Sequence, residues 1–465
     1  MISDLKPYAM YKESGLPWLG EVPAHWGQRR MKFLFRERVQ KGFPDEPLLA
    51  ATQSKGVLRK ADYGTRTVTA TKDFHLLKLV DRGDFVISLR SFEGGIEVAH
   101  CRGIISPAYT VLAPRTEATE GYYSRFFKSS AFISSLTLFV TGIREGQNVD
   151  YERLSRSYLP LPPADEQATI GRFLDWANGR LERAIRAKRK VIALLNEQKQ
   201  AIIHRAVTRG LDPSVPLKPS GIPWLGDIPQ HWEVLSLKRV LRRLIDCEHK
   251  TAPKVDKSDF RVVRTTAVRH GALRIHGTYC TSADAFRSWT RRGNPEPGDV
   301  IFTREAPAGE ACPVPAGMNV CLGQRTVLMK PNRQRLDSQF LIHTIYAGPP
   351  RVAISLASQG STVSHFNMSD IGSLPMLLPF REEQKEIVNA IFEQTSGLTT
   401  TISRLEREID LLREYRTRLV ADVVTGKLDV REAAARLPDE AAPDTVEDDT
   451  DPTLDPEAAH EEAVE

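Results

Sequence analysis

A thirteen-residue segment occurs twice in this chain, and the repeat constrains the fold more than any other feature. Residues 14–26 are SGLPWLGEVPAHW, and residues 220–232 are SGIPWLGDIPQHW. Nine of the thirteen positions are identical, and the copies lie 206 residues apart. Solenoid repeats have periods of about 20–50 residues, far below this offset. The repeat therefore predicts a duplicated domain, two similar halves and a bipartite binding partner.

The duplication continues beyond this segment. LPLPPADEQ at 159–167 aligns with MLLPFREEQ at 376–384, and AVTRGLD at 206–212 aligns with VVTGKLD at 423–429. Both pairs have an offset of 217 residues, so the second globular part contains eleven additional residues. The predicted order is globular part, helix, globular part, helix and tail.

Each predicted helix, the first at about 164–209 and the second within 378–432, carries an apolar stripe with steps of three, four and seven residues. This spacing is typical of a coiled-coil seam. The first stripe comprises Ile170, Leu174, Ala177, Leu181, Ile185, Ile192, Leu195, Ile202 and Ala206, and the second comprises Ile387, Ile391, Leu398, Ile402, Leu405, Ile409, Leu412, Leu419 and Val423. Lys188, which aligns with Leu405, interrupts the first stripe.

A helix with one narrow apolar stripe has no core of its own, but two such helices can pair. Roughly 40 residues at ~1.5 Å per residue give a rod of about 60 Å. Prolines precede each helix and glycines follow it, as is common at helix boundaries. The short connections between each helix and the next domain favour an antiparallel coiled coil within the chain. The alternative is that each helix packs separately on its own domain.

The globular parts are expected to be mixed. Residues 84–89 and 299–303 are predicted strands, 109–112 and 325–329 their partners, and helices are expected near 121–134 and 337–347. The fold class is therefore α+β, with two similar α/β domains, two long helices and internal pseudo-two-fold symmetry. The predicted boundaries are 1–160 and 213–377 for the domains, 161–212 and 378–432 for the helical regions, and 433–465 for a tail.

The net charge of +5 conceals an asymmetry. Residues 437–465 contain twelve Asp or Glu and no Lys or Arg, which leaves +17 on residues 1–436. The tail composition predicts disorder. A strongly basic body favours a polyanionic partner, most plausibly nucleic acid. The alternative is that the basic residues only solvate long helices.

Other classes of protein are disfavoured by what the sequence lacks. It has no apolar run long enough for a transmembrane helix, and its first residues lack the apolar core of a signal peptide. The five cysteines form no C-x-x-C pair, so a disulfide framework or a zinc site is not expected, and a reducing cytoplasm is the predicted location.

No catalytic motif is evident. The sequence contains no P-loop, no H-E-x-x-H, no G-x-S-x-G and no glycine-rich methyltransferase loop. His25 and His231 lie in the repeated Pro-x-His-Trp unit, which is predicted to be a packing anchor. Asp84 and Asp299 precede strands, where Asp commonly forms local hydrogen bonds. The sequence therefore predicts a binding protein without a metal site.

The combination of these features resembles the specificity (S) subunit of type I restriction–modification enzymes. The resemblance is carried by residues 14–20 with their copy at 220, and by 162–167 with their counterpart 379–384. It covers about residues 12–432. Lys188 on the stripe and the acidic tail depart from the family pattern.

This resemblance implies that each globular part is a target recognition domain reading one half of a split site in double-stranded DNA. The helices would form a spacer and dock two methylation (M) subunits, and restriction/translocation (R) subunits would join through the complex. The chain itself would be non-catalytic and bind no cofactor, with S-adenosylmethionine, ATP and Mg on partner subunits. Three alternatives stay open: a type IIB-like specificity subunit, a coiled-coil scaffold that binds proteins, and an enzyme with unrecognised motifs.

Candidate DNA-reading residues are polar side chains in predicted loops, because such side chains can reach base edges. In the first domain they are Gln53, Ser54, Lys55, Arg59, Arg90, Ser91, Arg144, Gln147 and Asn148. In the second they are Arg264, Thr265, Arg269, Arg304, Gln324, Arg325, Gln359, Ser361, Thr362 and His365. Two glycine-containing loops, 141–148 and 358–365, are the strongest candidates as sets. For any single residue, a solvated surface position is the alternative.

Overall fold

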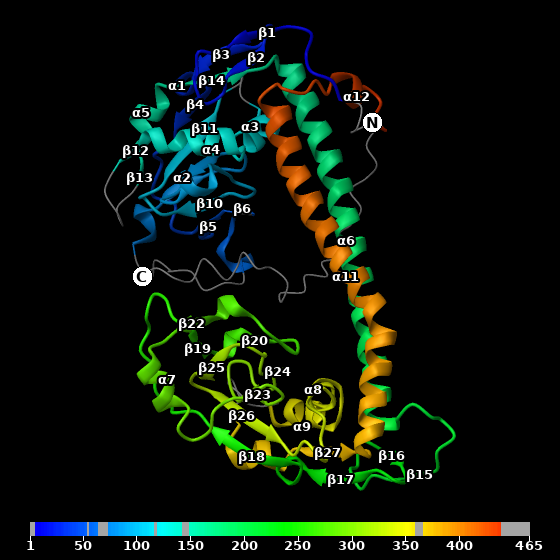
Figure 1. Cartoon of the computed structure of the whole chain (residues 1–465). Coiled ribbons are helices and arrows are strands. Elements are labelled where there is room, and N and C mark those ends of the chain that lie inside the picture. The colour runs from blue at the N-terminus through cyan, green and yellow to red at the C-terminus, as the bar shows by residue number, and fades with distance from the viewer. Residues whose placement is uncertain are drawn as a thin grey trace. The chain divides into compact units, whose positions relative to one another are not determined.

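The computed structural model describes residues 5–53, 55–63, 73–115, 119–141, 148–358 and 366–438 (Figure 1). It divides into two compact units: unit 1 comprises residues 1–186 and 409–465, and unit 2 comprises residues 187–408. The long helices are α6 (Ala164–Arg209) and α11 (Arg381–Val424). Each unit therefore combines one globular part with a segment of both helices. None of the helices in the described ranges has an apolar stretch that could span a membrane.

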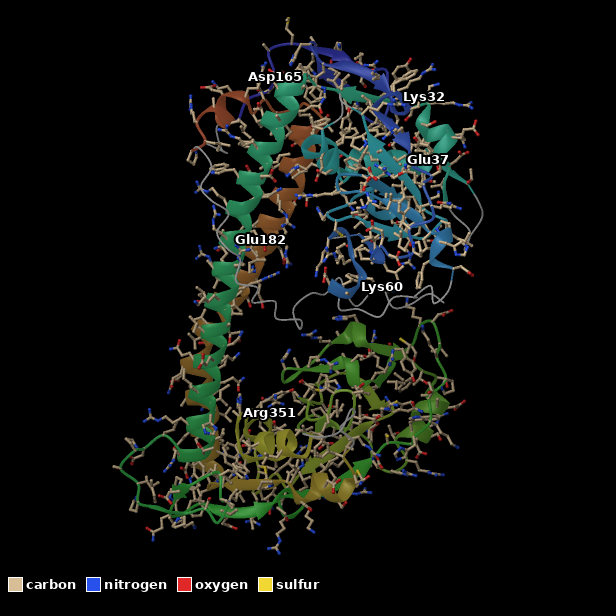
Figure 2. All side chains as sticks on the ribbon, turned by 180° about the vertical axis from the view of Figure 1, so that it is seen from behind. Lys32, Glu37, Lys60, Asp165, Glu182 and Arg351 are labelled. Carbon is tan, nitrogen blue, oxygen red and sulfur yellow. The ribbon has the colours of Figure 1, made fainter. Side chains whose placement is uncertain are left out.

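Within each unit the two helices lie side by side. In unit 2, Lys188 Nζ is 2.6 Å from Glu408 Oε2, and Lys199 Nζ donates to Thr399 Oγ1 over 3.0 Å. Residue numbers rise along one helix as they fall along the other, so the pairing is antiparallel. In unit 1, Glu182 of α6 (Figure 2) forms an ion pair of 3.1 Å with Arg416. The predicted antiparallel coiled coil is confirmed.

The seam of this coiled coil follows the apolar stripe. Every stripe residue is buried or half-buried. Lys188 lies at a seam position, and its side chain is 29% exposed beside Glu408 at 34%. The ion pair explains how a lysine occupies the stripe, because a polar seam residue is tolerated when it has a partner.

Unit 1 contains a four-stranded antiparallel sheet with the order β4-β11-β8-β9. Its strands are β4 (Phe35–Glu37), β8 (Phe85–Ile87), β9 (Glu97–Val98) and β11 (Thr110–Pro114). Strand pairs accompany it: β1 (Tyr11–Glu13) with β2 (Glu21–Pro23), β3 (Gly27–Arg30) with β14 (Tyr158–Leu161), β5 (Leu49–Thr52) with β6 (Gly56–Arg59), β7 (Lys78–Val80) with β10 (Gly103–Ile105), and β12 (Val140–Thr141) with β13 (Asn148–Val149). The helices are α1 (Met31–Leu34), α2 (Ser91–Gly94), α3 (Glu120–Phe126), α4 (Ser130–Leu136), α5 (Tyr151–Ser155) and α12 (Arg431–Ala435).

Unit 2 repeats this sheet in the order β18-β26-β23-β24. Its strands are β18 (Leu241–Asp246), β23 (Val300–Thr303), β24 (Ala311–Pro313) and β26 (Thr326–Pro331). A second sheet pairs β19 (Phe260–Val263) with β22 (Thr278–Cys280) and, in parallel, with β25 (Asn319–Leu322). The remaining elements are β15 (Leu217–Pro219), β16 (Asp227–Pro229), β17 (Glu233–Ser236), β20 (Val268–Arg269), β21 (Ala272–Leu273), β27 (Pro375–Leu378), α7 (Ala283–Trp289), α8 (Ser338–Ala347), α9 (Pro349–Ser358) and α10 (Met368–Ser373).

The predicted strands occupy the centres of these two sheets. β8 pairs with β11 in unit 1, and β23 pairs with β26 in unit 2. The aspartates before them form the expected local hydrogen bonds: Asp84 accepts from the Asp81 backbone over 2.8 Å, and Asp299 from the Glu296 backbone over 3.0 Å. Burial raises the pKa of Asp84, while its hydrogen bonds from Arg38 oppose this shift.

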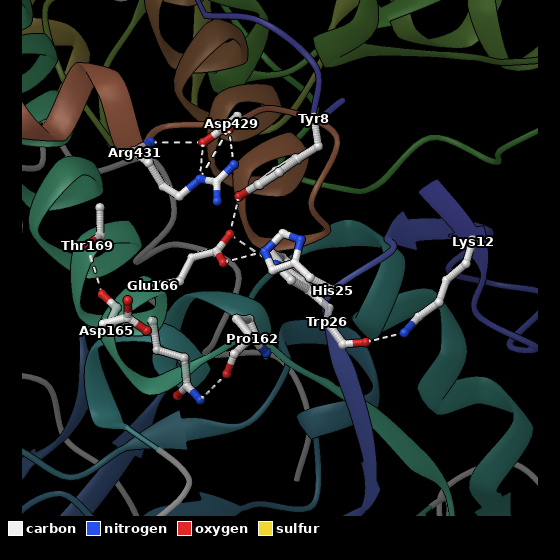
Figure 3. Close-up of polar contacts among 11 residues, drawn as sticks. Tyr8, Lys12, His25, Trp26, Pro162, Asp165, Glu166, Thr169, Asp429 and Arg431 are labelled. Atoms are coloured by element: carbon white, nitrogen blue, oxygen red, sulfur yellow. Dashed lines mark hydrogen bonds and ion pairs between the residues drawn. The ribbon is translucent and has the colours of Figure 1, made fainter. Parts of the chain in front are cut away.

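The two most similar sequence segments meet at one carboxylate in each unit. In unit 1, Glu166 Oε1 accepts from Trp26 Nε1 over 3.0 Å, and Glu166 Oε2 lies 2.7 Å from His25 Nε2 (Figure 3). In unit 2, Glu383 makes the same contacts with Trp232 at 3.0 Å and His231 at 2.8 Å. Both indoles are fully buried. We call each Trp-His-Glu arrangement a clamp, and it joins a globular part to the start of a long helix.

The glutamine beside each clamp makes a second connection. Gln167 donates to Pro162 O over 3.0 Å and accepts from Thr119 N, which caps α3, over 3.1 Å. Gln384 donates to Pro379 O over 2.9 Å and accepts from Asp337 N, which caps α8, over 2.8 Å. The Glu-Gln pair at the start of each long helix therefore positions both the repeated segment and one helix of the globular part.

The end of the other long helix completes each clamp. Gly426, with φ +77°, follows α11, and a Cβ there would lie 2.3 Å from Pro23 Cδ. Gly210, with φ +75°, follows α6, and a Cβ there would lie 3.4 Å from Trp232 Cζ2. Glycine suits both positions because it adopts positive φ without a steric penalty and leaves room for close packing. Each globular part is thus held by the start of one long helix and the end of the other.

The clamp of unit 1 has an additional layer, which is formed by residues 6–8 and 429–431. Tyr8 Oη donates to Glu166 Oε1 over 2.6 Å, and the Arg431 guanidinium lies 5.1 Å from the centre of the Tyr8 ring (Figure 3). Asp429 pairs with Arg431 at 2.7 Å, and its backbone N–H donates to Lys6 O over 2.8 Å. Burial and the Glu166 carboxylate hold the pKa of Tyr8 well above its usual range.

We expect Glu166→Ala to destabilise unit 1 by about 2–4 kcal/mol, because it leaves the buried Trp26 N–H and Tyr8 O–H without an acceptor. Glu383→Ala is the matched control. The Glu383 side chain is 24% exposed, against 3% for Glu166. In the Glu383→Ala variant, water can therefore replace the carboxylate as the hydrogen-bond acceptor. Hydrogen–deuterium exchange measured separately in the two units checks this; equal losses of protection would contradict the expected difference.

Candidate nucleic-acid interface

Loops at one end of the main sheet of unit 2 gather polar side chains. The register places Asp246 of β18 opposite Val327, and Thr303 of β23 opposite Thr326. The ends of β18 and β23 therefore lie beside the start of β26. Residues that follow the first two strands become neighbours of Gln324 and Arg325, which precede the third.

An ion pair between a buried arginine and a half-buried aspartate ties these loops together. Arg304 Nη1 donates to both carboxylate oxygens of Asp246, each over 2.9 Å, and Arg304 is only 8% exposed. Its backbone N–H donates to Arg325 O over 3.0 Å. His249 Nε2 lies 2.9 Å from Asp246 Oδ2. Arg304 thus fixes the loop after β18 against the turn before β26.

Three non-glycine residues in these loops have left-handed backbones: His249 with φ +52°, Ala306 with φ +53° and Arg325 with φ +67°. Such conformations cost about 1–3 kcal/mol each and persist where the surrounding structure imposes them. They cluster at ligand-binding and catalytic sites. Here all three lie in loops at the same end of one sheet, which marks this end as the candidate site.

A cavity of about 450 Å³ opens at this end. It is lined by Thr251, Ala252, Lys254, Arg264, Thr265, Tyr279, Gly323, Gln324 and Arg325. Three of these residues are cationic and none is acidic, although Arg325 also pairs with Glu305 at 3.2 Å. The two threonines supply hydroxyl groups, Gln324 supplies an amide, and Tyr279 supplies an aromatic ring. This set suits an anionic ligand with hydrogen-bonding groups, such as a phosphate and its attached nucleotide.

One group of three potential metal ligands occurs among the described residues: Asp246, Cys247 and His249. Their ligand atoms lie within 4.8 Å of one another. However, both oxygens of Asp246 already accept from the Arg304 guanidinium. Because that cation neutralises the carboxylate, the arrangement fits a structural ion pair better than a metal site.

The corresponding region of unit 1 is formed by α2, which follows β8, and the β5–β6 hairpin. Lys128 Nζ donates to Gln53 O over 2.8 Å and to Gly94 O over 2.7 Å, which ties the hairpin tip to α2. Lys128 also pairs with the buried Glu97. The hairpin tip is closed by Thr52 Oγ1, which accepts from Lys55 N over 2.9 Å. A lysine therefore organises these loops, where an Arg–Asp pair does so in unit 2.

Comparison with known proteins gives a consistent result. The chain is 21% identical over 448 residues to the MjaX specificity subunit assigned to a type I restriction enzyme of Methanocaldococcus jannaschii, covering 89% of this chain and 96% of that protein. It is 21% identical over 365 residues to the type I restriction enzyme MjaVIII specificity subunit of the same organism, covering 76% and 81%. No protein-family model matches.

Among solved structures, one chain aligns with a TM-score of 0.59 and 15% identity, covering 88% of this chain and 99% of that one. That structure is described as the structural basis underlying complex assembly and conformational transition of the type I R-M system. At this identity it establishes the shared fold.

The chain is therefore similar, over most of its length, to specificity subunits of type I restriction enzymes. The structure brings together several of the residues proposed from sequence. Arg264, Thr265, Gln324 and Arg325 line the cavity, and Arg304 lies buried beside it. Arg269 does not line it; its Nη1 donates to the backbone oxygens of Thr265 and Val268 over 2.7 and 2.8 Å.

In unit 1, Gln53 and Lys55 are exposed at the β5–β6 tip, Arg59 is exposed at the end of β6, and Arg90 is exposed before α2. Ser91 is buried and accepts from Ser88 N over 2.8 Å. Asn148 belongs to β13, and its side chain accepts from Val149 N over 2.9 Å. Seven predicted residues lie outside the described residues: Ser54, Arg144, Gln147, Gln359, Ser361, Thr362 and His365.

Sequence reasoning missed Lys254, Tyr279 and Asp246. Lys254 could have been found from the basic segment that contains Lys250, Lys254 and Lys257. Tyr279 carries no local signal, because it reaches the cavity through the pairing of β22 with β19. Asp246 is recognised only by its contact with Arg304, 58 residues away in sequence.

We expect Asp246→Asn to loosen these loops, because it removes the negative charge beside a buried guanidinium. Breaking a buried pair costs several kcal/mol, and partial exposure of Asp246 reduces this to about 2 kcal/mol. Hydrogen exchange should accelerate in segments 246–251 and 323–326. His249→Ala is the control, since His249 is exposed and contacts the same carboxylate. Equal exchange in both variants would contradict a special role for the Arg304 pair.

Proposed function

We propose that this chain is the DNA sequence-specificity subunit of a type I restriction–modification complex, in which each globular part reads one half of a bipartite site. One observation carries the proposal: both units build the same four-stranded sheet and the same clamp, yet their loops at the sheet end differ. A shared scaffold presents the two loop sets in equivalent ways, and different loops select different half-sites.

The charge distribution supports DNA as the ligand. Residues 1–436 carry a net charge of +17, which favours association with a polyanion. In unit 2, Lys254, Arg264 and Arg325 are suited to phosphate oxygens, which position a protein on the duplex. Gln324 carries an amide that can pair with an adenine edge. Positioning and base reading would thus be combined at one sheet end.

The coiled coil would dock two methylation subunits and set the spacing between half-sites, and restriction/translocation subunits would join through the complex. In this proposal the chain performs no chemistry and holds no cofactor. S-adenosylmethionine, ATP and Mg would be bound by the partner subunits. The assembly would work in the cytoplasm.

We expect Arg264→Ala and Arg325→Ala each to weaken binding of cognate duplex DNA by the assembled methylase and to reduce the slope of log affinity against log salt by about 1 if the contact is to phosphate. Arg335→Ala is the matched control, because Arg335 follows β26 at the opposite end of the sheet and pairs with Glu233 at 3.0 Å. Fluorescence anisotropy across a salt series measures both effects. If the slope were unchanged in all three variants, the cavity residues would not contact DNA phosphates, and the cavity would not be part of the DNA interface.

Exchanging about residues 14–160 for the equivalent part of another specificity subunit tests the proposed function directly. Because each unit has its own core and clamp, the exchange should change one half of the methylated sequence and leave the other half intact. Sequencing that detects methylated adenines reads both halves at once. If both halves changed, or if no bipartite methylation occurred with the partner subunits, the two-reader proposal would be wrong.

A further inference from the structure

The segment of α6 in unit 1 carries three exposed arginines that the repeat does not duplicate. They are Arg180, Arg183 and Arg186. At the offset of 217 residues they align with Gly397, Thr400 and Ser403. Small neutral residues occupy the same positions of α11, so keeping a long helix in water does not require arginine there. The three arginines are therefore a specific feature of α6, and we call them the arginine face.

The arginine face lies on the side of α6 that is turned away from the coiled-coil seam. Because a helix turns about 100° per residue, Arg183 lies opposite Leu174 and Leu181, which are buried in the seam. Arg180 and Arg186 lie within about 60° of Arg183, one on each side. The three guanidinium groups thus share one solvent-facing surface.

This surface has an excess of positive charge that neighbouring side chains do not balance. Residues 172–190 of α6 contain two acidic residues, Asp175 and Glu182, and these already pair with Arg125 and Arg416. The Arg180 guanidinium lies 5.2 Å from the centre of the Trp176 ring. In the described ranges none of the three arginines of the face forms an ion pair. A polyanionic segment would complement this surface.

The last described residues of the chain lie beside the same side of α6. Ala433, Ala434 and Leu437 are buried in the core of unit 1. Arg172 Nη2 donates to Ala434 O over 2.9 Å, and Figure 1 shows α12 beside the N-terminal part of α6. Arg172 lies within about 20° of Arg183 around the helix. The acidic tail, which continues from residue 439, is therefore tethered next to the arginine face.

The tail has the length and the charge to cover this face. Arg186 follows Arg172 by 14 residues, which is about 21 Å along the helix. Residues 439–451 contain seven Asp or Glu and no Lys or Arg. Thirteen residues extend up to about 45 Å, so this segment alone can span the face. A short tether also gives the tail an effective concentration on the order of mM at the arginines.

We propose that residues 439–451 bind the arginine face of α6, with their carboxylates paired to Arg180, Arg183 and Arg186. Exposed ion pairs are individually weak and sensitive to salt, so the contact is reversible. Its consequence rests on the proposed function: the tail screens these arginines from DNA of arbitrary sequence. Binding to such DNA depends on phosphate contacts with cations, and it competes with binding at the recognised site.

The contact is tested in the full chain with the photo-cross-linking residue p-benzoylphenylalanine in place of Val446. Mass spectrometry identifies the residues to which position 446 becomes linked after illumination. At 0.1 M salt the cross-links should fall on residues 172–190. At 1 M salt they should decrease at least about fivefold, because the screening length falls from about 10 to about 3 Å.

The combined variant Arg180→Gln, Arg183→Gln and Arg186→Gln should lose these cross-links to the same extent at 0.1 M salt. The matched control removes three exposed arginines of α11 by Arg404→Gln, Arg407→Gln and Arg418→Gln, and it should keep the cross-links. Circular dichroism should show that the helices persist in both. Cross-links that fall on other segments, or that survive the loss of the arginine face, would overturn the proposal.

The screening role is tested with the assembled methylase by replacing the twelve Asp and Glu of residues 437–465 with Asn and Gln. Affinity for a random-sequence duplex should rise at least about threefold, because nonspecific binding depends on phosphate contacts. The increase should disappear when the arginine face is also replaced. An unchanged affinity, or an increase that persists without these arginines, would overturn the screening role.

The cross-linking experiment contains no DNA, so its result is separate from the proposed function. A chain whose tail links to α6 but whose assembly methylates no bipartite DNA would overturn the proposed function and leave the tail contact standing. An assembly that methylates such DNA while its tail links elsewhere would overturn the tail contact alone.

Discussion

The structure depends on one interaction that is made twice: a glutamate at the start of a long helix accepts a hydrogen bond from a buried indole of the globular part. Glu166 and Glu383 each connect a repeated segment to a helix that begins about 140–150 residues later in sequence. The adjacent glutamine adds a bond to a capping residue of a second helix. Because these buried polar groups satisfy one another, the orientation of helix and sheet within a unit is set by hydrogen-bond geometry as well as by apolar packing.

The two clamps are similar but not equal. In unit 2 the connection from α6 to β15 is covalent, whereas in unit 1 the corresponding place is occupied by two separate segments of the chain, joined by the bond from Asp429 N to Lys6 O. Tyr8 and Arg431 add a hydrogen bond and a cation–π contact there. Noncovalent contacts thus replace a peptide connection, and this explains why the Glu166 carboxylate is more deeply buried and has more donors than Glu383.

The same scaffold separates constant from variable features. The sheet order, the clamp and the coiled-coil seam recur in both units, while the loops at the sheet end are organised by Arg304 and Asp246 in unit 2 and by Lys128 in unit 1. Loops carried on a rigid sheet can change without loss of the core, and this is the usual place for recognition residues.

Periodicity and repetition in the sequence alone determined the two long helices, their antiparallel pairing, the duplicated mixed domains and the acidic tail. These features can be predicted because seam spacing and turn residues are patterns of only a few residues. The repeat also shows directly which segments of the two halves are equivalent. Only the tertiary structure decided that Glu166 meets Trp26, that Arg304 meets Asp246, and that Tyr279 and Lys254 join Arg264 and Arg325 around one cavity. Those contacts join residues tens to more than a hundred positions apart. Their partners are selected by strand register and burial, which no local pattern of side chains encodes.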